Sequence, residues 1–317
     1  MTGAAGYLGS VLVGKLLDGG HHVIGYDNLM YSQMSLLQYT SHPNFSFVWG
    51  DVDNYSDDYK KLILDSEYVL PLACLVGATS SIRESHKSDL VNWHSISELS
   101  EYISIHNLET KIIFPTTNSG YGAQSGEVYC TEETELQPIS PYGKQKVNAE
   151  KFLLHNCKNA ITLRLATVFG ASSRMRLDLL VNFTVWKALT DHVICVPEDI
   201  AHNMRNYVHI QDVVNCFLFC MENFEVMKGK PYNLGNDDEN RSVLDLSKLI
   251  ANEVGCGLVM TDHYKDPDKR NYLVSNERLR QAGFEAKRTI QDEIPNLVKV
   301  CKMIQMLNYG RSEFRNA

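Results

Sequence analysis

The sequence has no long apolar run and no excess of positive charge. No stretch approaches the about 18 uninterrupted apolar residues of a transmembrane helix, and the N-terminus lacks the regions of a signal peptide. The 30 Lys and Arg residues are outnumbered by 38 Asp and Glu, which gives a net charge of −8. Because nucleic acids and anionic lipids attract basic faces, we expect no nucleic-acid partner, no membrane and a cytoplasmic location.

Cysteines at metal-ligand spacing are also absent. The eight cysteines include no Cys-x-x-Cys pair and have no nearby histidine at such a spacing. Cys216 and Cys220 lie one helical turn apart, but the surrounding DVVNCFLFCMEN is apolar enough for a core helix. We expect reduced, mostly buried thiols and no metal site.

Short apolar runs alternate with helical patterns along the first half of the chain. Strand-like segments are HHVIGYD, FSFVWGD, YVLPLA, KIIFPTT and ITLRLATV. Apolar residues recur at helical spacing in LGSVLVGKLLD, which Gly19 and Gly20 end, and over 55–64, 88–107 and 141–156. Strands that alternate with helices predict an α/β fold with a mostly parallel, doubly wound sheet.

Beyond residue 170 the pattern is less regular. We expect a helix in LDLLVNFTVWKAL, a short strand in VHI, a helix from Asp212 and a later helix with Ser242 as its N-cap. With 317 residues, 44% of them hydrophobic, the chain can form two unequal domains. The predicted division assigns 1–168 plus about 203–235 to the sheet domain and 169–202 plus 236–317 to a smaller lobe.

The sequence begins with a glycine-rich turn. Gly3, Gly6 and Gly9 have the G-x-x-G-x-x-G spacing of a turn whose backbone N–H groups approach a pyrophosphate at a helix N-terminus. Such a turn normally follows a buried strand, yet only Met1 precedes TGAAGYLG. We therefore expect a truncated first strand with Met1 at its last position. In a doubly wound sheet that strand is central, so its loss would leave two neighbours without backbone partners.

An acidic residue ends the second strand-like segment. Asp27 lies 18 residues after Gly9, where a carboxylate can accept hydrogen bonds from an adenosine ribose and repel a 2′-phosphate. This placement favours NAD over NADP, although an aspartate before Asn28 is also a common turn residue. Asp51, after the next strand, could face the adenine or simply cap its strand.

Tyr142 and Lys146 lie four residues apart in a predicted helix. This spacing places both side chains on one face, where the ammonium can stabilise the phenolate and lower the tyrosine pKa toward neutrality. Such a tyrosine can accept the proton of an alcohol. FPTTNSGYG ends a strand at the sheet edge where ligands bind, and Thr117 there can hydrogen-bond the reacting oxygen.

These motifs together resemble the extended short-chain dehydrogenases/reductases, a family that modifies nucleotide sugars. The resemblance covers essentially the whole chain, through TGAAGYLG, Asp27, LACLVGA, TTNSGYG, Tyr142-x-x-x-Lys146, LRLATVFG, RNYVHIQDVV and YNLGN. It implies a Rossmann fold, NAD as cofactor, a nucleotide-sugar substrate and a homodimer that forms through 88–107 and 141–156. By this resemblance Thr117 hydrogen-bonds the substrate, Tyr142 is the acid/base and Lys146 bridges the tyrosine and the nicotinamide ribose. The expected cofactor contacts are Gly3, Gly6, Tyr7, Leu8, Gly9, Asp27, Asn28, Asp51, Val52, Leu72, Ala73, Tyr142 and Lys146.

The residues after Thr117 bear on the reaction. In the family's 4,6-dehydratases this position is followed by an acidic general acid and base, whereas Asn118 and Ser119 follow here and cannot do that work at neutral pH. Dehydration is therefore disfavoured. TTNSGYG, RLATVFGASSRMRLDLLVN and DPDKRNYLVSNERL resemble the GDP-D-glycero-D-manno-heptose 4-dehydrogenases of bacterial capsule pathways, which keep NAD(H) tightly bound. Alternatives are a 4-epimerase and a non-catalytic nucleotide-sugar-binding relative, and the intact Thr117, Tyr142 and Lys146 speak against the latter.

Five side chains are candidates to bind the substrate, because guanidinium groups contact diphosphate oxygens at two points. They are Arg174, Arg176, Asn182, Arg205 and Arg270. Some of these arginines could instead form ion pairs on the surface or between the two lobes.

Overall fold

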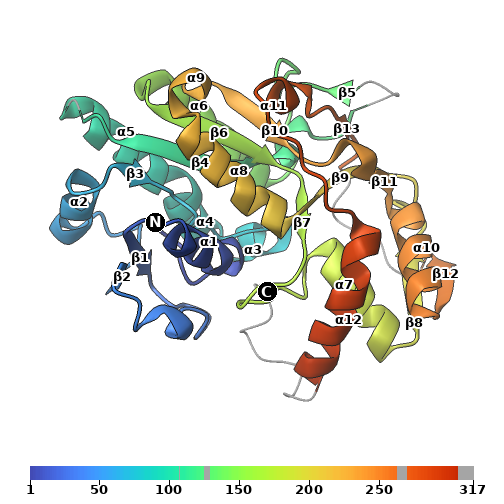
Figure 1. Cartoon of the computed structure of the whole chain (residues 1–317). Coiled ribbons are helices and arrows are strands. Elements are labelled where there is room, and N and C mark those ends of the chain that lie inside the picture. The colour runs from blue at the N-terminus through green and yellow to red at the C-terminus, as the bar shows by residue number, and fades with distance from the viewer. Residues whose placement is uncertain (107, 125–128, 263–269, 306–317) are drawn as a thin grey trace.

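A parallel β-sheet forms the centre of the larger part of the molecule (Figure 1). The computed structural model describes residues 1–106, 108–124, 129–262 and 270–305. Strands β10 (Pro231–Leu234), β6 (Ala160–Leu165), β4 (Lys111–Thr117) and β3 (Tyr68–Val69) are neighbours in that order, and β1 (Val23–Asp27) pairs with β2 (Phe45–Trp49). Thr2 joins the two groups through parallel bridges to Tyr26 and Pro71. The predicted α/β fold with a doubly wound parallel sheet is confirmed, and Met1 and Thr2 lie in the central strand position.

Strand β4 shows how the sequence builds both faces of this sheet. Ile113 packs in one hydrophobic cluster with Leu12 of α1 (Tyr7–Asp18) and Phe217 of α8 (Ile210–Glu222). Its neighbours Ile112 and Phe114 pack on the opposite face, in the cluster of α5 (Ser95–Ile105) and α6 (Pro141–Asn156). Successive strand residues point to opposite faces, so an uninterrupted apolar run is what a strand covered on both sides requires.

The helices of the sheet domain begin and end near the predicted positions. On one face lie α1 (Tyr7–Asp18), which ends at Gly19, α8 (Ile210–Glu222) and α9 (Phe224–Met227). The other helices are α2 (Asp57–Leu64), α3 (Ala78–Arg83), α4 (Ser85–Asp89), α5 (Ser95–Ile105) and α6 (Pro141–Asn156). Helix α6 has the bounds that its sequence predicts, because Ser140 caps it and Pro141 occupies its first turn.

A second hydrophobic cluster is built from residues after 168. It joins α7 (Leu180–Thr190), α10 (Val243–Val254) and α12 (Ile290–Gln305) with β8 (Val193–Pro197), which pairs with β12 (Gly257–Thr261). Figure 1 shows these elements side by side on the right. The remaining elements are β5 (Tyr129–Cys130), β7 (Thr167–Phe169), β9 (Met204–His209), β11 (Asn240–Ser242), β13 (Leu273–Val274) and α11 (Glu277–Gln281). The domain boundaries given above stay a prediction.

Two predicted elements are divided in the structure. ITLRLATV leaves the central sheet at Ala166, so that β7 pairs with β9 and carries the chain toward the lobe. The predicted helix over 88–107 contains a π-helical turn, Leu90–His94, between α4 and α5. There the Asn92 side chain hydrogen-bonds both the N–H and the C=O of Leu75, at 2.9 and 3.0 Å. π-helical turns are rare and occur mostly as single turns inside α-helices, as here.

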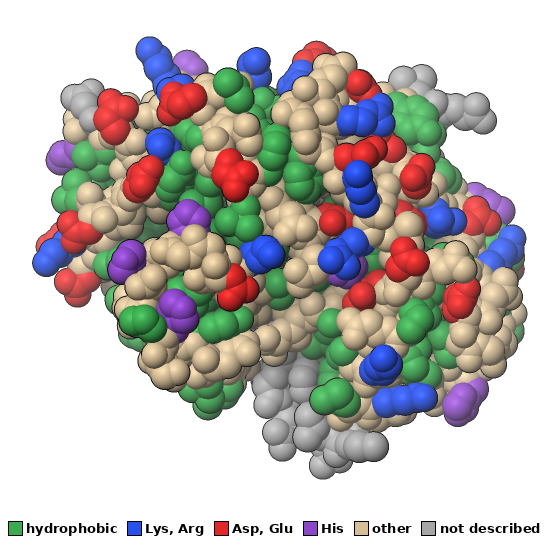
Figure 2. Space-filling model, viewed as in Figure 1, with side chains coloured by type: hydrophobic (Ala, Val, Ile, Leu, Met, Phe, Trp, Pro, Cys, Tyr) green, Lys and Arg blue, Asp and Glu red, His purple; other side chains and the backbone are tan. Residues whose placement is uncertain are grey.

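Charge and apolar surface are mixed on the outside. Acidic and basic side chains are interspersed over the face shown in Figure 2. Within the described part of the chain, no helix has both the length and the apolar character that crossing a bilayer requires.

Candidate active site

A cavity of about 880 Å³ lies between the sheet domain and the second cluster. Its walls come from the glycine turn and the carboxyl ends of β1, β4 and β6 on one side, and from α7, β8 and Arg270 on the other. In doubly wound sheets the carboxyl edge is where ligands bind. The cavity therefore has the place of a nucleotide site in such sheets, and its volume lies at the upper end of the range for small-molecule and cofactor sites.

The glycine turn is packed too tightly for side chains. Gly3 has a φ of +62°, and a Cβ there would lie 2.6 Å from the backbone nitrogen of Ala73. A Cβ on Gly9 would lie 2.2 Å from the carbonyl oxygen of Gly3. Gly6 is the N-cap of α1 and has no side chain to occupy the helix N-terminus, which faces the cavity. The turn thus forms a backbone cradle for an anion, which fits the pyrophosphate of a dinucleotide.

Asp27 lies beside this turn at the end of β1 and is buried. Its Oδ2 accepts a hydrogen bond from the Ala5 N–H at 2.9 Å, and its Oδ1 accepts from the Leu29 N–H at 2.8 Å and from the Gln33 amide at 3.3 Å. Burial raises the pKa of Asp27, and the two backbone N–H donors oppose that rise. The carboxylate thus both holds the turn against β1 and lines the cavity.

A second carboxylate lies farther along the same wall. Asp51 Oδ2 accepts hydrogen bonds from the Asn28 amide at 2.7 Å and from the Lys87 ammonium at 2.8 Å. Burial opposes ionisation, but Lys87 and Asn28 bring the pKa of Asp51 below its ordinary value. Lys87 also contacts Asp53. Lys87 could not be predicted from the sequence, because nothing local to α4 shows that it faces a strand end 36 residues earlier.

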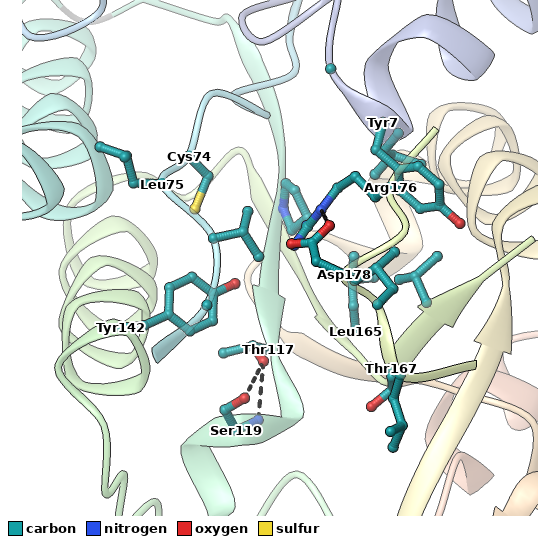
Figure 3. Close-up of a pocket in the computed structure, with 18 of the residues that line it drawn as sticks. Tyr7, Cys74, Leu75, Thr117, Ser119, Tyr142, Leu165, Thr167, Arg176 and Asp178 are labelled. Atoms are coloured by element: carbon teal, nitrogen blue, oxygen red, sulfur yellow. Dashed lines mark hydrogen bonds and ion pairs between the residues drawn. The ribbon is translucent and has the colours of Figure 1, made fainter. Parts of the chain in front are cut away.

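Thr117, Tyr142 and Lys146 meet at the other end of the cavity. Figure 3 shows the Tyr142 ring entering from α6 and Thr117 rising from the end of β4, with Cys74 on the wall above them. Thr117 Oγ1 donates to Ser119 Oγ at 2.9 Å, and the Arg270 guanidinium also contacts Ser119 Oγ. The Cys74 side chain lies close enough to Tyr142 to affect its pKa, and sequence reasoning did not identify it.

The electrostatics of Tyr142 differ from the expectation based on spacing. Burial raises the pKa of Tyr142 far above its ordinary value, and the cations that most oppose this rise are Arg176 and Arg270. Lys146 lies on the same face of α6, but its ammonium lies over the ring of Phe114, 3.9 Å from the centroid. Burial lowers the pKa of Lys146. The prediction that Lys146 brings the tyrosine pKa toward neutrality is therefore wrong for the protein alone.

A buried ionic network supports the same helix. Glu150, one turn beyond Lys146, pairs with Arg164 of β6 at 2.6 Å and accepts a hydrogen bond from Thr116 at 2.8 Å. Arg164 also donates to the Tyr121 hydroxyl at 3.0 Å. All four side chains are buried. The network ties α6 to β4, β6 and the turn after Thr117, and the contacts that define it are too long-range for sequence spacing to reveal.

The predicted substrate ligands separate into groups. Arg270 and Arg176 lie near Tyr142, and Arg176 pairs with Asp178 at 2.7 Å. Arg205 lines the lobe side of the cavity beside Tyr272, 5.9 Å from the ring centroid. Arg174 instead lies over Tyr31, close to Asp27.

Asn182 does not line the cavity, contrary to expectation. It is fully buried, its Oδ1 accepts from the Gly170 N–H at 3.1 Å, and its amide donates to the Arg176 carbonyl at 3.0 Å. Because its amide hydrogen-bonds the backbone of the 170–176 segment, Asn182 supports the cavity wall from outside the cavity. No group of three or more His, Cys, Asp or Glu side chains in the described ranges could hold a metal ion.

Comparisons with known proteins agree with this architecture. The model of the NAD dependent epimerase/dehydratase family matches residues 1–235. Protein CapI of Staphylococcus aureus is 27% identical over 94% of this chain and 96% of its own length. The uncharacterized UDP-glucose epimerase YtcB of Bacillus subtilis is 29% identical over 84% of both chains.

Solved structures share the fold. UDP-glucuronic acid 4-epimerase from Bacillus cereus, in complex with UDP-glucuronic acid and NAD, superposes with a TM-score of 0.84 at 23% identity, covering 96% of this chain and 98% of its own. dTDP-glucose 4,6-dehydratase from Bacillus anthracis, in complex with NAD, gives 0.82 at 22% identity and 96% coverage of both chains.

Proposed function

The chain belongs to the NAD dependent epimerase/dehydratase family, and from that premise we propose that it oxidises the 4-hydroxyl of a nucleotide-diphosphate sugar to a 4-keto group. The family acts on nucleotide sugars, and NAD is the cofactor. The substrate that we propose is GDP-D-glycero-D-manno-heptose, on the resemblance of TTNSGYG, the 164–182 segment and DPDKRNYLVSNERL to the 4-dehydrogenases of that sugar.

The observation that carries this proposal is the convergence of Thr117, Tyr142 and Arg270 at one end of a cavity whose other end is the glycine turn. A dinucleotide with its pyrophosphate at the turn has room to extend toward Tyr142. When bound, NAD would supply the acceptor for the hydride that leaves C4. The chain supplies the proton acceptor, the Tyr142 hydroxyl, and a second hydrogen-bonding group, Thr117, for the same sugar oxygen.

The charges around Tyr142 match this role. Burial opposes ionisation of the Tyr142 phenol. The positive charges of Arg176 and Arg270 act in the other direction and favour the phenolate that takes the substrate proton. The reaction then balances as alcohol plus NAD⁺ giving ketone, NADH and one proton. The family resemblance implies that Lys146, on the same helix face as Tyr142, would hold the nicotinamide ribose.

Dehydration is disfavoured by the side chains next to Thr117. Asn118 is 1% exposed and does not line the cavity. Ser119 does line it, but a serine hydroxyl is neither an acid nor a base at neutral pH. The elimination of water from the sugar needs both.

A 4-epimerase is the second candidate. Solved structures with this fold include UDP-glucuronic acid 4-epimerase and UDP-glucose 4-epimerase, the latter from Thermotoga maritima with a TM-score of 0.82. Both reactions begin with oxidation at C4, and they differ in whether the hydride returns to the opposite face of the keto sugar.

Mixing NAD-loaded protein with a panel of GDP- and UDP-sugars, in single turnover, tests the proposal. A 4-dehydrogenase gives nicotinamide absorbance together with a product two mass units lighter. An epimerase gives a product of unchanged mass with an inverted 4-hydroxyl. Binding of a sugar nucleotide with neither product would indicate a non-catalytic relative and would contradict the proposal.

A further inference from the structure

The segment from Gly170 to Arg176 docks on the start of helix α1. Tyr7 donates its hydroxyl to the Gly170 carbonyl at 2.7 Å, and the Ser172 hydroxyl donates to the Tyr7 carbonyl, also at 2.7 Å. Ser10 and Ser172 hydroxyls are 3.1 Å apart. Although this segment follows β7 and leads into α7, its side chains are tied to the helix whose N-terminus receives the pyrophosphate.

Two further contacts fix the segment from other sides. Gln38 donates to Ser173 Oγ at 3.2 Å, which links the segment to the loop that follows β1. Asn182 of α7 holds the backbone of Gly170 and Arg176 from behind. The segment therefore spans the cleft on the side where the glycine turn and Asp27 lie.

Arg174 projects from this segment into the cavity and is 3% exposed. Its guanidinium carbon lies 4.8 Å from the centroid of the Tyr31 ring, which also lines the cavity. Asp27 ends β1 and Tyr31 follows it, at the end of the cleft where an adenosine ribose fits. Arg174 and Asp27 are close enough for their charges to affect one another.

Arg174 and Arg176 are two buried guanidinium groups that lie close together on the 170–176 segment. Burial and the charge of Arg176 lower the pKa of Arg174 to about 10, because two buried guanidinium groups repel. A phosphate placed near Arg174 would relieve that repulsion, and guanidinium is suited to bind it at two points. Two carboxylates act on Arg174: Asp178, which pairs with Arg176, and Asp27, which accepts hydrogen bonds from Ala5, Leu29 and Gln33.

We propose that Arg174 binds the cofactor and not the sugar nucleotide: it contacts the pyrophosphate and adenosine-ribose portion of NAD, and the 170–176 segment keeps NAD bound between turnovers. This proposal differs from the expectation from sequence, which grouped Arg174 with the substrate ligands. It rests on the cofactor and is independent of which sugar is oxidised.

Exchange of isotopically labelled NAD into the NAD-loaded protein tests the proposal without any turnover. Arg174→Ala should speed exchange at least about tenfold, because a desolvated, charge-assisted contact is lost. Arg174→Lys keeps the charge but not the planar, stacking fork, so its rate should be intermediate. Tyr31→Leu should give a smaller increase that does not add to that of Arg174→Ala, because both act through one contact.

Two controls make the outcome decisive. Arg280→Ala removes an exposed arginine of α11 that lies outside this cavity and should leave exchange unchanged. Arg174→Met keeps the aliphatic stem in place, so it serves if the alanine variant folds poorly. Wild-type exchange in both Arg174→Ala and Arg174→Met, with weaker binding of GDP or UDP, would assign Arg174 to the sugar nucleotide and overturn the proposal. If the Arg174 variants bind NAD, GDP and UDP as the parent protein does, the proposal is overturned as well.

Discussion

The two walls of the cavity position their functional groups by different means. On the sheet wall, the glycine turn, Asp27 and Thr117 each lie where a strand ends, so backbone pairing places them. On the opposite wall, Arg174 and Arg176 come from a segment with no regular structure, which side-chain hydrogen bonds hold across the cleft. Substitutions that disturb the strand ends of the first wall should therefore lower the free energy of unfolding. Substitutions in the second wall should mainly lower the affinity for ligands.

The largest expected effect is on stability, and it comes from the buried Glu150–Arg164 pair that supports the sheet wall. Glu150→Gln leaves the Arg164 guanidinium buried without its carboxylate, so the free energy of unfolding should fall by about 3–5 kcal/mol. The double variant Glu150→Leu with Arg164→Met removes both charges and should recover much of that loss. Urea denaturation of the parent protein, the single variant and the double variant measures the change in the free energy of unfolding. A loss below about 1 kcal/mol in the single variant would mean that the network does not stabilise α6.

Removal of the proton acceptor comes next. Tyr142→Phe keeps the ring but loses the hydroxyl, so single-turnover formation of NADH should fall at least about 10²-fold while nucleotide-sugar affinity changes little. Thr117→Val is the matched comparison. It removes one hydrogen bond to the same oxygen and should be milder, about tenfold. Near-normal oxidation by Tyr142→Phe would show that another group takes the proton.

The contrast between the walls also explains what the sequence could predict. Strand and helix periodicity placed β4 and α6, and the motifs on them led to Thr117 and Tyr142 with no knowledge of packing. The partners of Arg174 and Asn182 lie more than a hundred residues away or on other elements, so spacing carried no information about them. The same limit applies to Cys74, which meets Tyr142 only through the fold.

A smaller effect is expected on the preference for NAD over NADP. NAD should bind more tightly than NADP, because Asp27 meets the 2′-phosphate with a like charge. Asp27→Asn should narrow this preference by about tenfold, and the nearby Arg174 should help to bind the added phosphate. It should also lower the melting temperature, since the carboxylate holds Ala5 and Leu29. Titration of both cofactors checks this, and equal affinities in the parent protein would contradict it.

The smallest expected effect is a shift in pH dependence, and it links the two walls. Tyr142 on the sheet wall must lose its proton to act as a base, and Arg176 on the other wall is a cation that lowers its pKa. Arg176→Met should therefore move the rising limb of the single-turnover rate to higher pH. Asp178 pairs with Arg176 at 2.7 Å and offsets its charge, so Asp178→Asn should move the same limb to lower pH. Circular dichroism first establishes that both variants are folded at the assay temperature. Shifts of opposite sign would show that the charge of Arg176 reaches Tyr142, whereas shifts of the same sign would indicate that both changes only disturb the 170–176 segment.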